Sequence, residues 1–192
     1  ALSYNKRNKF REEKYNQAKS VGYTLVNYIS SKATIWNDLT LGDNCFILEE
    51  QNIQPFVKIG NNVMLWSGNH IGHGTVISDH TYISSHVVLS GNCEIGRRCF
   101  FGVTSTSQAF VQIGDDVFIG MDASITNDIA DGSVVLSSGT VVSETSDRIA
   151  KALHTSYFGI SIGKNFIPYH WQPSGLVILP TAHLSFLFPP SL

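Results

Sequence analysis

WSGNHIGHGTVISDHTYISSHVVLSGN (residues 66–92) places an aliphatic residue at every sixth position. The same phase extends on both sides over sixteen positions, of which fifteen are Ile, Leu or Phe. Neither the 3.6-residue period of a helix nor the alternation of a strand gives a strict six-residue phase over this length. The positions are Ile35, Leu41, Ile47, Ile53, Ile59, Leu65, Ile71, Ile77, Ile83, Leu89, Ile95, Phe101, Ser107, Ile113, Ile119 and Ile125.

A second phase lies two residues before the first and holds mostly small or β-branched residues; its exceptions are Leu39, Gln51 and Asn69. Gly or Ser often follows the aliphatic residue, where a tight corner needs little side chain. Each hexapeptide therefore predicts one short strand and one corner, and three hexapeptides complete one triangular coil. Stacked coils bury the aliphatic column. We expect an all-β fold, a parallel β-helix.

The repeat predicts where this solenoid begins and ends. After Ile125 the phase slips by two residues, to Ile129, Val135 and Val141, and then fades. We therefore expect the solenoid to occupy residues 33–142. The tail, residues 143–192, continues no repeat.

Residues 1–32 differ in composition from the repeat. Asn8 to Ser20 is rich in Lys, Arg, Glu and Gln and predicts a solvated helix that stops at Gly22. Strands are expected on both sides of it, at Ala1–Tyr4 and at Tyr23–Ile29. This order predicts the back half of an α/β unit over residues 1–32; the alternative is a simple N-terminal arm.

Composition excludes several classes of partner. The chain carries 13 Lys and Arg against 15 Asp and Glu, a net charge of −2, so no basic field attracts nucleic acid or an anionic membrane. No apolar run approaches the roughly 20 residues of a membrane-spanning helix, and the start has no apolar signal segment. We expect a soluble, cytoplasmic protein with no nucleic-acid or membrane partner.

The three cysteines fit the repeat better than they fit a chemical site. Cys45, Cys93 and Cys99 all occupy the small-residue phase, and no C-x-x-C pair is present. We interpret them as small buried hydrophobic residues.

HIGHGTVISDHTYISSHVVLSGNCEIGRRCFFGV (residues 70–103) resembles the core of the bacterial sugar acyltransferases. This family includes the sialic acid O-acetyltransferases and the N-acetyltransferases of bacillosamine and perosamine biosynthesis. The resemblance covers residues 1 to about 142 and implies a left-handed helix. It implies that residues 1–32 are the second half of a nucleotide-sugar-binding domain whose first strand and glycine-rich turn are not in this chain.

The resemblance implies an acetyl-CoA-dependent acetyltransferase that acts on an amino group or hydroxyl of a sugar in surface polysaccharide or glycan biosynthesis. His73 fills the position of the family's histidine base, and Gly91 fills that of a glycine whose N–H stabilises the oxyanion. Gly91 lies three hexapeptides, and so one full coil, after His73, and the repeat independently predicts that they are neighbours. The sequence departs from the family at Gly74, where an acidic residue usually follows the histidine, and at Tyr82, where relatives often carry a second histidine.

The remaining site residues are also expectations. A homotrimer is implied, because packing between two solenoids makes a cleft from their shallow flanks. We expect Asn69, which breaks the small-residue phase, or a carboxylate of the adjacent subunit, to orient His73. Acetyl-CoA is expected beside Gly91, Gly102, Val103, Gly120, Met121 and Tyr82, and the acceptor beside His70 and Trp66.

Two other functions fit the same repeat. Hexapeptide solenoids include zinc carbonic anhydrases, but the histidine spacings here, three, seven and six residues from His70 through His73 and His80 to His86, do not match theirs. We therefore expect no metal. His80 and His86 occupy equivalent places in successive hexapeptides, which predicts surface or corner roles. The second alternative is a non-catalytic trimeric solenoid used for binding or assembly.

Overall fold

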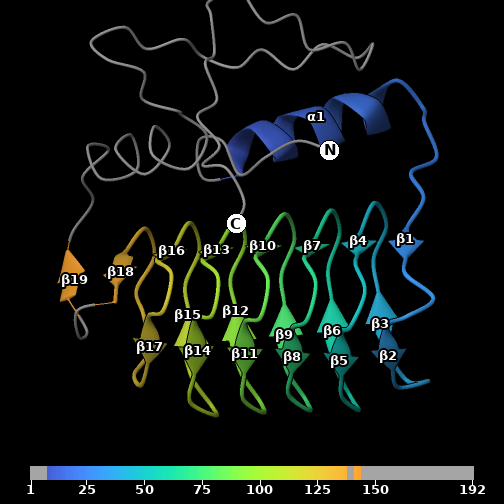
Figure 1. The fold of residues 1–192 in the computed structure, drawn as a ribbon. Coiled ribbons are helices and arrows are strands. Elements are labelled where there is room, and N and C mark those ends of the chain that lie inside the picture. Colours follow the sequence, from blue (N-terminus) through green and yellow to red (C-terminus); the bar gives the residue numbers. More distant parts are fainter. Residues whose placement is uncertain (1–7, 138–140, 144–192) are drawn as a thin grey trace, which may run out of the picture. The chain divides into compact units, whose positions relative to one another are not determined.

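Among the described residues, short parallel strands wind around one interior in three sheets, and one helix lies beside them (Figure 1). The computed structural model describes residues 8–137 and the backbone of residues 141–143. The strand expected at residues 1–4 and the tail after Ser143 lie outside this range. Sheet A contains β1 (Tyr28–Ile29), β4 (Phe46–Ile47), β7 (Met64–Leu65), β10 (Tyr82–Ile83), β13 (Phe100–Phe101), β16 (Phe118–Ile119), β18 (Val134–Leu136) and β19 (Val141–Ser143). Sheet B contains β2 (Thr34–Ile35), β5 (Asn52–Ile53), β8 (His70–Ile71), β11 (Val88–Leu89), β14 (Thr106–Ser107) and β17 (Ser124–Ile125). Sheet C contains β3 (Thr40–Leu41), β6 (Lys58–Ile59), β9 (Val76–Ile77), β12 (Glu94–Ile95) and β15 (Gln112–Ile113).

The strand register confirms a coil of three hexapeptides. Ile71 of β8 pairs with Leu89 of β11, and Ile77 of β9 pairs with Ile95 of β12, each one coil further along the chain. The aliphatic column is buried from Ile47 to Ile125, and all three cysteines are buried beside it. Burial raises the pKa of the Cys45 thiol to about 11. The fold is a left-handed parallel β-helix, as expected.

Both ends of the solenoid depart from the regular coil. At the far end Val134 of β18 pairs with Phe118 of β16, a separation two residues shorter than a regular coil. This confirms the predicted slip of the repeat after Ile125. Strand β19 then runs antiparallel to β18. At the near end β1 pairs with β4, so the solenoid begins at Tyr28 and not at the expected residue 33. The reason is that Ile29 lies six residues before Ile35 and already follows the aliphatic phase.

Three corners join the sheets, and each is named here by the sheets that it connects. Corner AB includes Gly102 and Met121, corner BC includes His73 and Gly91, and corner CA includes His80. In most corners the residue two positions before the next strand has a positive φ, including His80 (66°) and His86 (58°). Both histidines are therefore corner residues, as expected, although only His86 is exposed.

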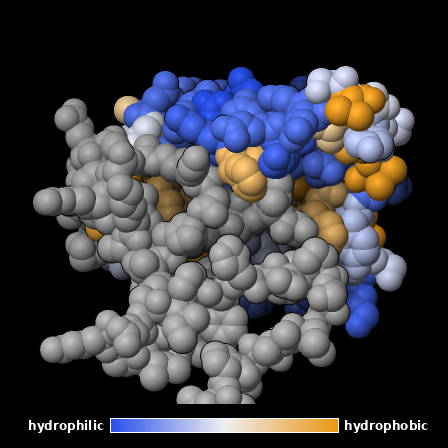
Figure 2. Space-filling model, turned by 90° about the horizontal axis from the view of Figure 1, so that it is seen from above, coloured by the Kyte–Doolittle hydropathy of each residue, from blue (hydrophilic) through white to orange (hydrophobic). Residues whose placement is uncertain are grey.

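Helix α1 (Lys9–Ser20) covers corner CA and matches the predicted helix closely. The guanidinium of Arg11 is buried and donates to the carbonyl oxygens of Asn62 (2.6 Å) and His80 (3.0 Å). Burial lowers the pKa of Arg11 to about 10. The carboxylate of Glu12 accepts from Arg97 at 2.7 Å. Polar contacts thus hold the helix to the corner, while its outer side is hydrophilic (Figure 2).

No helix in the described part of the chain is long and apolar enough to cross a bilayer.

His80 is enclosed between corner CA and α1. Its ring is 3% exposed, with Nδ1 3.0 Å from the Asn62 amide nitrogen and Nε2 3.6 Å from Glu12. Burial lowers the pKa of His80, although the charges of Glu12 and Asp79 act in the opposite direction. A neutral ring that accepts from Asn62 and points its N–H toward Glu12 satisfies both neighbours.

Acid should therefore weaken the protein through His80. Below about pH 6.5 the unfolded chain binds a proton at this position that the folded chain does not, so stability falls as the pH drops below that value. His80→Asn, which keeps a residue that tolerates positive φ, should reduce the fall in the thermal midpoint between pH 7 and pH 5.5. Parallel curves for the two proteins would contradict this assignment.

Candidate active site

His73 lies on corner BC two residues after the end of β8, and Gly91 occupies the equivalent place one coil further on. A Cβ atom on Gly91 would lie 2.5 Å from Cε1 and 2.7 Å from Nε2 of His73. Real Cβ atoms do not approach other atoms this closely, so the imidazole occupies space that a side chain at position 91 would fill. The exposed ring of His73 therefore lies over bare backbone.

The backbone beside the ring presents a donor. Within the described residues the N–H of Gly91 donates to no other group. A Cβ on Gly72 would lie 2.5 Å from this nitrogen, so the absence of a side chain at Gly72 allows the close approach of the two coils. A basic ring and this N–H thus lie next to each other, which suits proton abstraction and oxyanion stabilisation.

Asn92 is a neighbour of His73 that sequence reasoning missed. Its backbone N–H donates to the His73 carbonyl oxygen at 2.7 Å, and its amide nitrogen is 3.5 Å from His73 Nε2. The signal was present, because Asn92 lies one coil after Gly74, as Gly91 lies one coil after His73.

Asn69 is not brought to His73. It is 1% exposed and lies inside the coil, where its amide donates to the Trp66 carbonyl oxygen at 2.5 Å and accepts from the Val87 N–H at 2.8 Å. Gln51, the other polar exception, also donates to the Trp66 carbonyl. The break in the small-residue phase therefore has a structural cause, since both amides cap backbone groups inside the solenoid.

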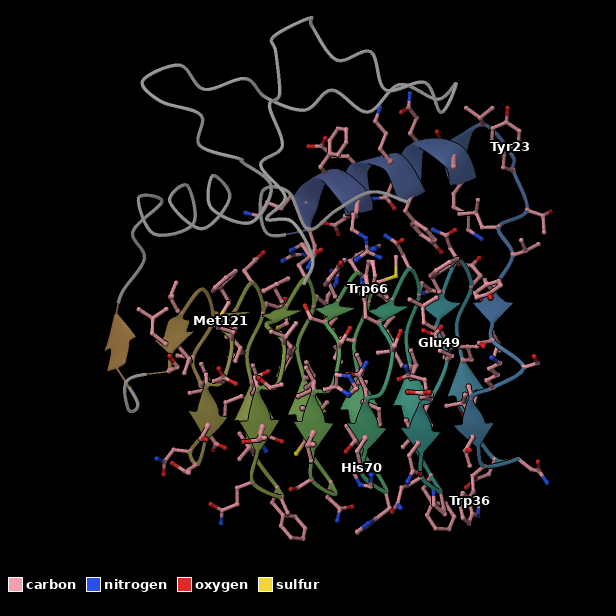
Figure 3. All side chains as sticks on the ribbon, viewed as in Figure 1. Tyr23, Trp36, Glu49, Trp66, His70 and Met121 are labelled. Carbon is pink, nitrogen blue, oxygen red and sulfur yellow. The ribbon has the colours of Figure 1, made fainter. Side chains whose placement is uncertain are left out.

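The expected cofactor and substrate residues fall into separate groups. Trp66, Gly102, Val103, Gly120 and Met121 lie on corner AB. In Figure 3 Trp66 and Met121 are well above His70. His70 lies on β8 of sheet B, between corners AB and BC. Gly102 is required by the fold whether or not a cofactor binds, because its Cβ would lie under 3.0 Å from the backbone nitrogen of Met121 in the next coil.

Tyr82 is placed away from both groups. It precedes Ile83 on β10, so it points outward from sheet A, the one sheet that does not border corner BC. Its ring stacks on Phe100 with the centroids 5.5 Å apart. One chain therefore cannot bring Tyr82 to His73.

Corner BC is an open surface in the single chain. Phe56 and Phe110 stand on the same corner, one coil before Gly74 and one coil after Asn92, and they are 72% and 73% exposed. Two cavities, of about 770 and 570 Å³, lie on sheet C and beneath α1, and neither includes His73. Among the described residues no cluster of His, Cys, Asp and Glu could hold a metal ion.

Gly91→Ala should force the ring of His73 to move. We expect a loss of about 1–3 kcal/mol in stability, the usual cost of overpacking, and a smaller loss when His73→Ala is also present, because the clash is then removed. Thermal or urea unfolding of the two single variants and the double variant measures this coupling. Equal costs in both backgrounds would show that the ring does not occupy this space.

Comparison with known proteins supports the fold. Residues 56–91 match the family described as bacterial transferase hexapeptide (six repeats). A histidine-to-asparagine variant of perosamine N-acetyltransferase from Caulobacter crescentus, in complex with CoA and GDP-perosamine, is similar with a TM-score of 0.70 and 21% identity. The match covers 72% of this chain and 66% of that one, just under two thirds of its length.

Two further structures are similar. The acetyltransferase domain of PglB from Neisseria gonorrhoeae has a TM-score of 0.69 and 23% identity, over 71% of this chain and 67% of that chain. AntD, an N-acyltransferase from Bacillus cereus in complex with dTDP and 3-hydroxybutyryl-CoA, has a TM-score of 0.56 and 17% identity, over 74% of this chain and 94% of that chain. This chain therefore shares the left-handed β-helix fold of these acyltransferases.

Proposed function

We propose that this protein is an acetyl-CoA-dependent acetyltransferase that acts on an amino group or hydroxyl of a nucleotide-linked sugar. The observation that carries the proposal is the exposed imidazole of His73 over the bare backbone of Gly91, beside an N–H that no described residue accepts. The similar structures that hold CoA with GDP-perosamine, or dTDP with an acyl-CoA, support the two substrate classes.

The reaction needs no covalent enzyme intermediate. The acceptor's nitrogen or oxygen attacks the thioester carbonyl of acetyl-CoA, and His73 takes the proton that the acceptor loses. The Gly91 N–H stabilises the negative oxygen of the tetrahedral intermediate. The carbon–sulfur bond then breaks, the thiolate of CoA takes the proton back from His73, and the acetylated sugar and free CoA leave.

The proposed active form is a homotrimer. His73 and Gly91 lie on corner BC, whereas Gly102, Val103, Gly120 and Met121 lie on corner AB of the same chain. A closed ring places corner AB of one copy against corner BC of the next, and it repeats this contact three times. The pantetheine arm of acetyl-CoA would run in the cleft between them, beside Met121, whose side chain is exposed in the single chain.

Replacing the base should abolish most of the turnover. We expect His73→Ala to lower kcat by about 10²- to 10⁴-fold, the usual contribution of a positioned general base, and to leave the affinity for acetyl-CoA nearly unchanged. His86→Ala, on corner AB, is the matched control and should retain activity. Steady-state kinetics with a panel of nucleotide amino sugars, and calorimetry with acetyl-CoA, measure both effects. Normal turnover of His73→Ala would favour a non-catalytic solenoid.

A cleft shared between two copies predicts the mass of the oligomer and the activity of oligomers mixed from two variants. Light scattering should give about three times 21.1 kDa. Mixed oligomers of His73→Ala and Met121→Glu chains should recover part of the activity that each variant lacks alone, since some clefts then pair an intact corner AB with an intact corner BC. A fully active monomer, or no recovery in oligomers shown to be mixed, would contradict the shared cleft.

A further inference from the structure

We propose that Asn92 is the positioning residue for His73, and that the glycine at position 74 is what gives Asn92 room to reach the ring. This inference rests on the proposed role of His73 as the base. It assigns to Asn92 the orienting role that sequence reasoning gave to Asn69 or to a partner's carboxylate.

Three contacts join Asn92 to the dipeptide one coil before it. The Asn92 N–H donates to the His73 carbonyl oxygen at 2.7 Å, which fixes the two backbones relative to each other. Its carboxamide nitrogen is 3.5 Å from His73 Nε2. Its carboxamide oxygen lies over the Cα of Gly74, under 3.0 Å from where a Cβ would stand. The side chain thus spans from Gly74 to the imidazole.

Gly74 is therefore more than a corner residue. Its φ of 68° favours glycine, but twelve corner positions with a φ between 55° and 66° carry other residues, so conformation alone does not require glycine here. The Asn92 side chain does require it, because any Cβ at position 74 would displace the carboxamide. Gly74 stands where the resembled family usually carries an acidic residue, and its missing side chain is what allows the contact between Asn92 and the ring.

The contact selects one tautomer of the ring. When the Asn92 amide donates to Nε2, that nitrogen holds the lone pair and Nδ1 carries the hydrogen. Nε2 is then the basic nitrogen. At 3.5 Å the contact is long enough for an incoming acceptor to share or replace it. After proton transfer, a half-turn of the carboxamide presents its oxygen to the new N–H and stabilises the imidazolium.

The first test removes the side chain without straining the backbone. Asn92→Gly keeps a residue that tolerates the positive φ of 57°, and Asn44→Gly, at a φ of 56° on corner CA, is the matched control. We expect Asn92→Gly to lower kcat about 5- to 10-fold, the worth of one hydrogen bond, with KM for acetyl-CoA unchanged and kcat of Asn44→Gly unchanged. Equal kinetics in the two variants would overturn the proposal.

The second test observes the ring itself and needs no acceptor. Nitrogen NMR of the histidine side chains reports the tautomer of His73 in the full-length protein. We expect the tautomer ratio to change in Asn92→Gly and not in Asn44→Gly. An unchanged tautomer ratio of His73 in Asn92→Gly would overturn the proposal.

The third test couples the two positions. Gly74→Ala should lower kcat by displacing the carboxamide, but it should cost nothing further in the Asn92→Gly background. Additive losses in kcat would mean that Gly74 affects only the backbone conformation of the corner and does not act through Asn92. If His73→Ala is fully active, the proposed function fails; if His73→Ala is inactive while Asn92→Gly matches Asn44→Gly, only the positioning role fails.

Discussion

The stacking of aliphatic residues inside the coil is the constraint on which the rest of this structure depends. Each Ile or Leu of the column lies between its equivalents one coil before and one coil after it, at the roughly 4.8 Å spacing of neighbouring strands. A slip of the register by one residue would turn the column outward and expose the core. Every corner residue therefore has a fixed neighbour in the next coil, and the pairs His73–Gly91 and Gly74–Asn92 follow from it.

Because the register is fixed, corners CA and BC carry different residues and differ in what covers them. Corner CA is covered by α1, and its carbonyl oxygens are satisfied by the buried guanidinium of Arg11. A buried cation is tolerated there because hydrogen bonds replace its water. The part of corner BC around His73 carries few side chains, because Gly72, Gly74 and Gly91 leave the backbone bare there. The first corner stabilises the fold, and the second leaves its polar groups available to a ligand.

The proposed reaction takes place at the surface of the solenoid that is exposed in the single chain. His73 and Met121 lie on different corners, and both are exposed in the single chain. A cleft that excludes water strengthens the interaction between the oxyanion and its N–H donor, because charge is screened less where the dielectric constant is low. In the proposed trimer a second copy is the surface that would supply such a cleft.

The sequence by itself determined the coil, because a six-residue phase has one structural solution. It predicted the register between successive coils, the slip after Ile125, the burial of the cysteines, the helix at residues 9–20 and the pairing of His73 with Gly91. The early start of the solenoid was also readable, from Ile29. What only the tertiary structure decided was where polar side chains point. Asn69 broke the pattern and was expected near the base, yet it turns inward to cap the Trp66 carbonyl. Asn92 fits the pattern of a corner residue, yet it reaches the ring. Periodicity fixes which backbones are neighbours, whereas the direction of a side chain depends on the space that glycines such as Gly74 leave open in the adjacent coil.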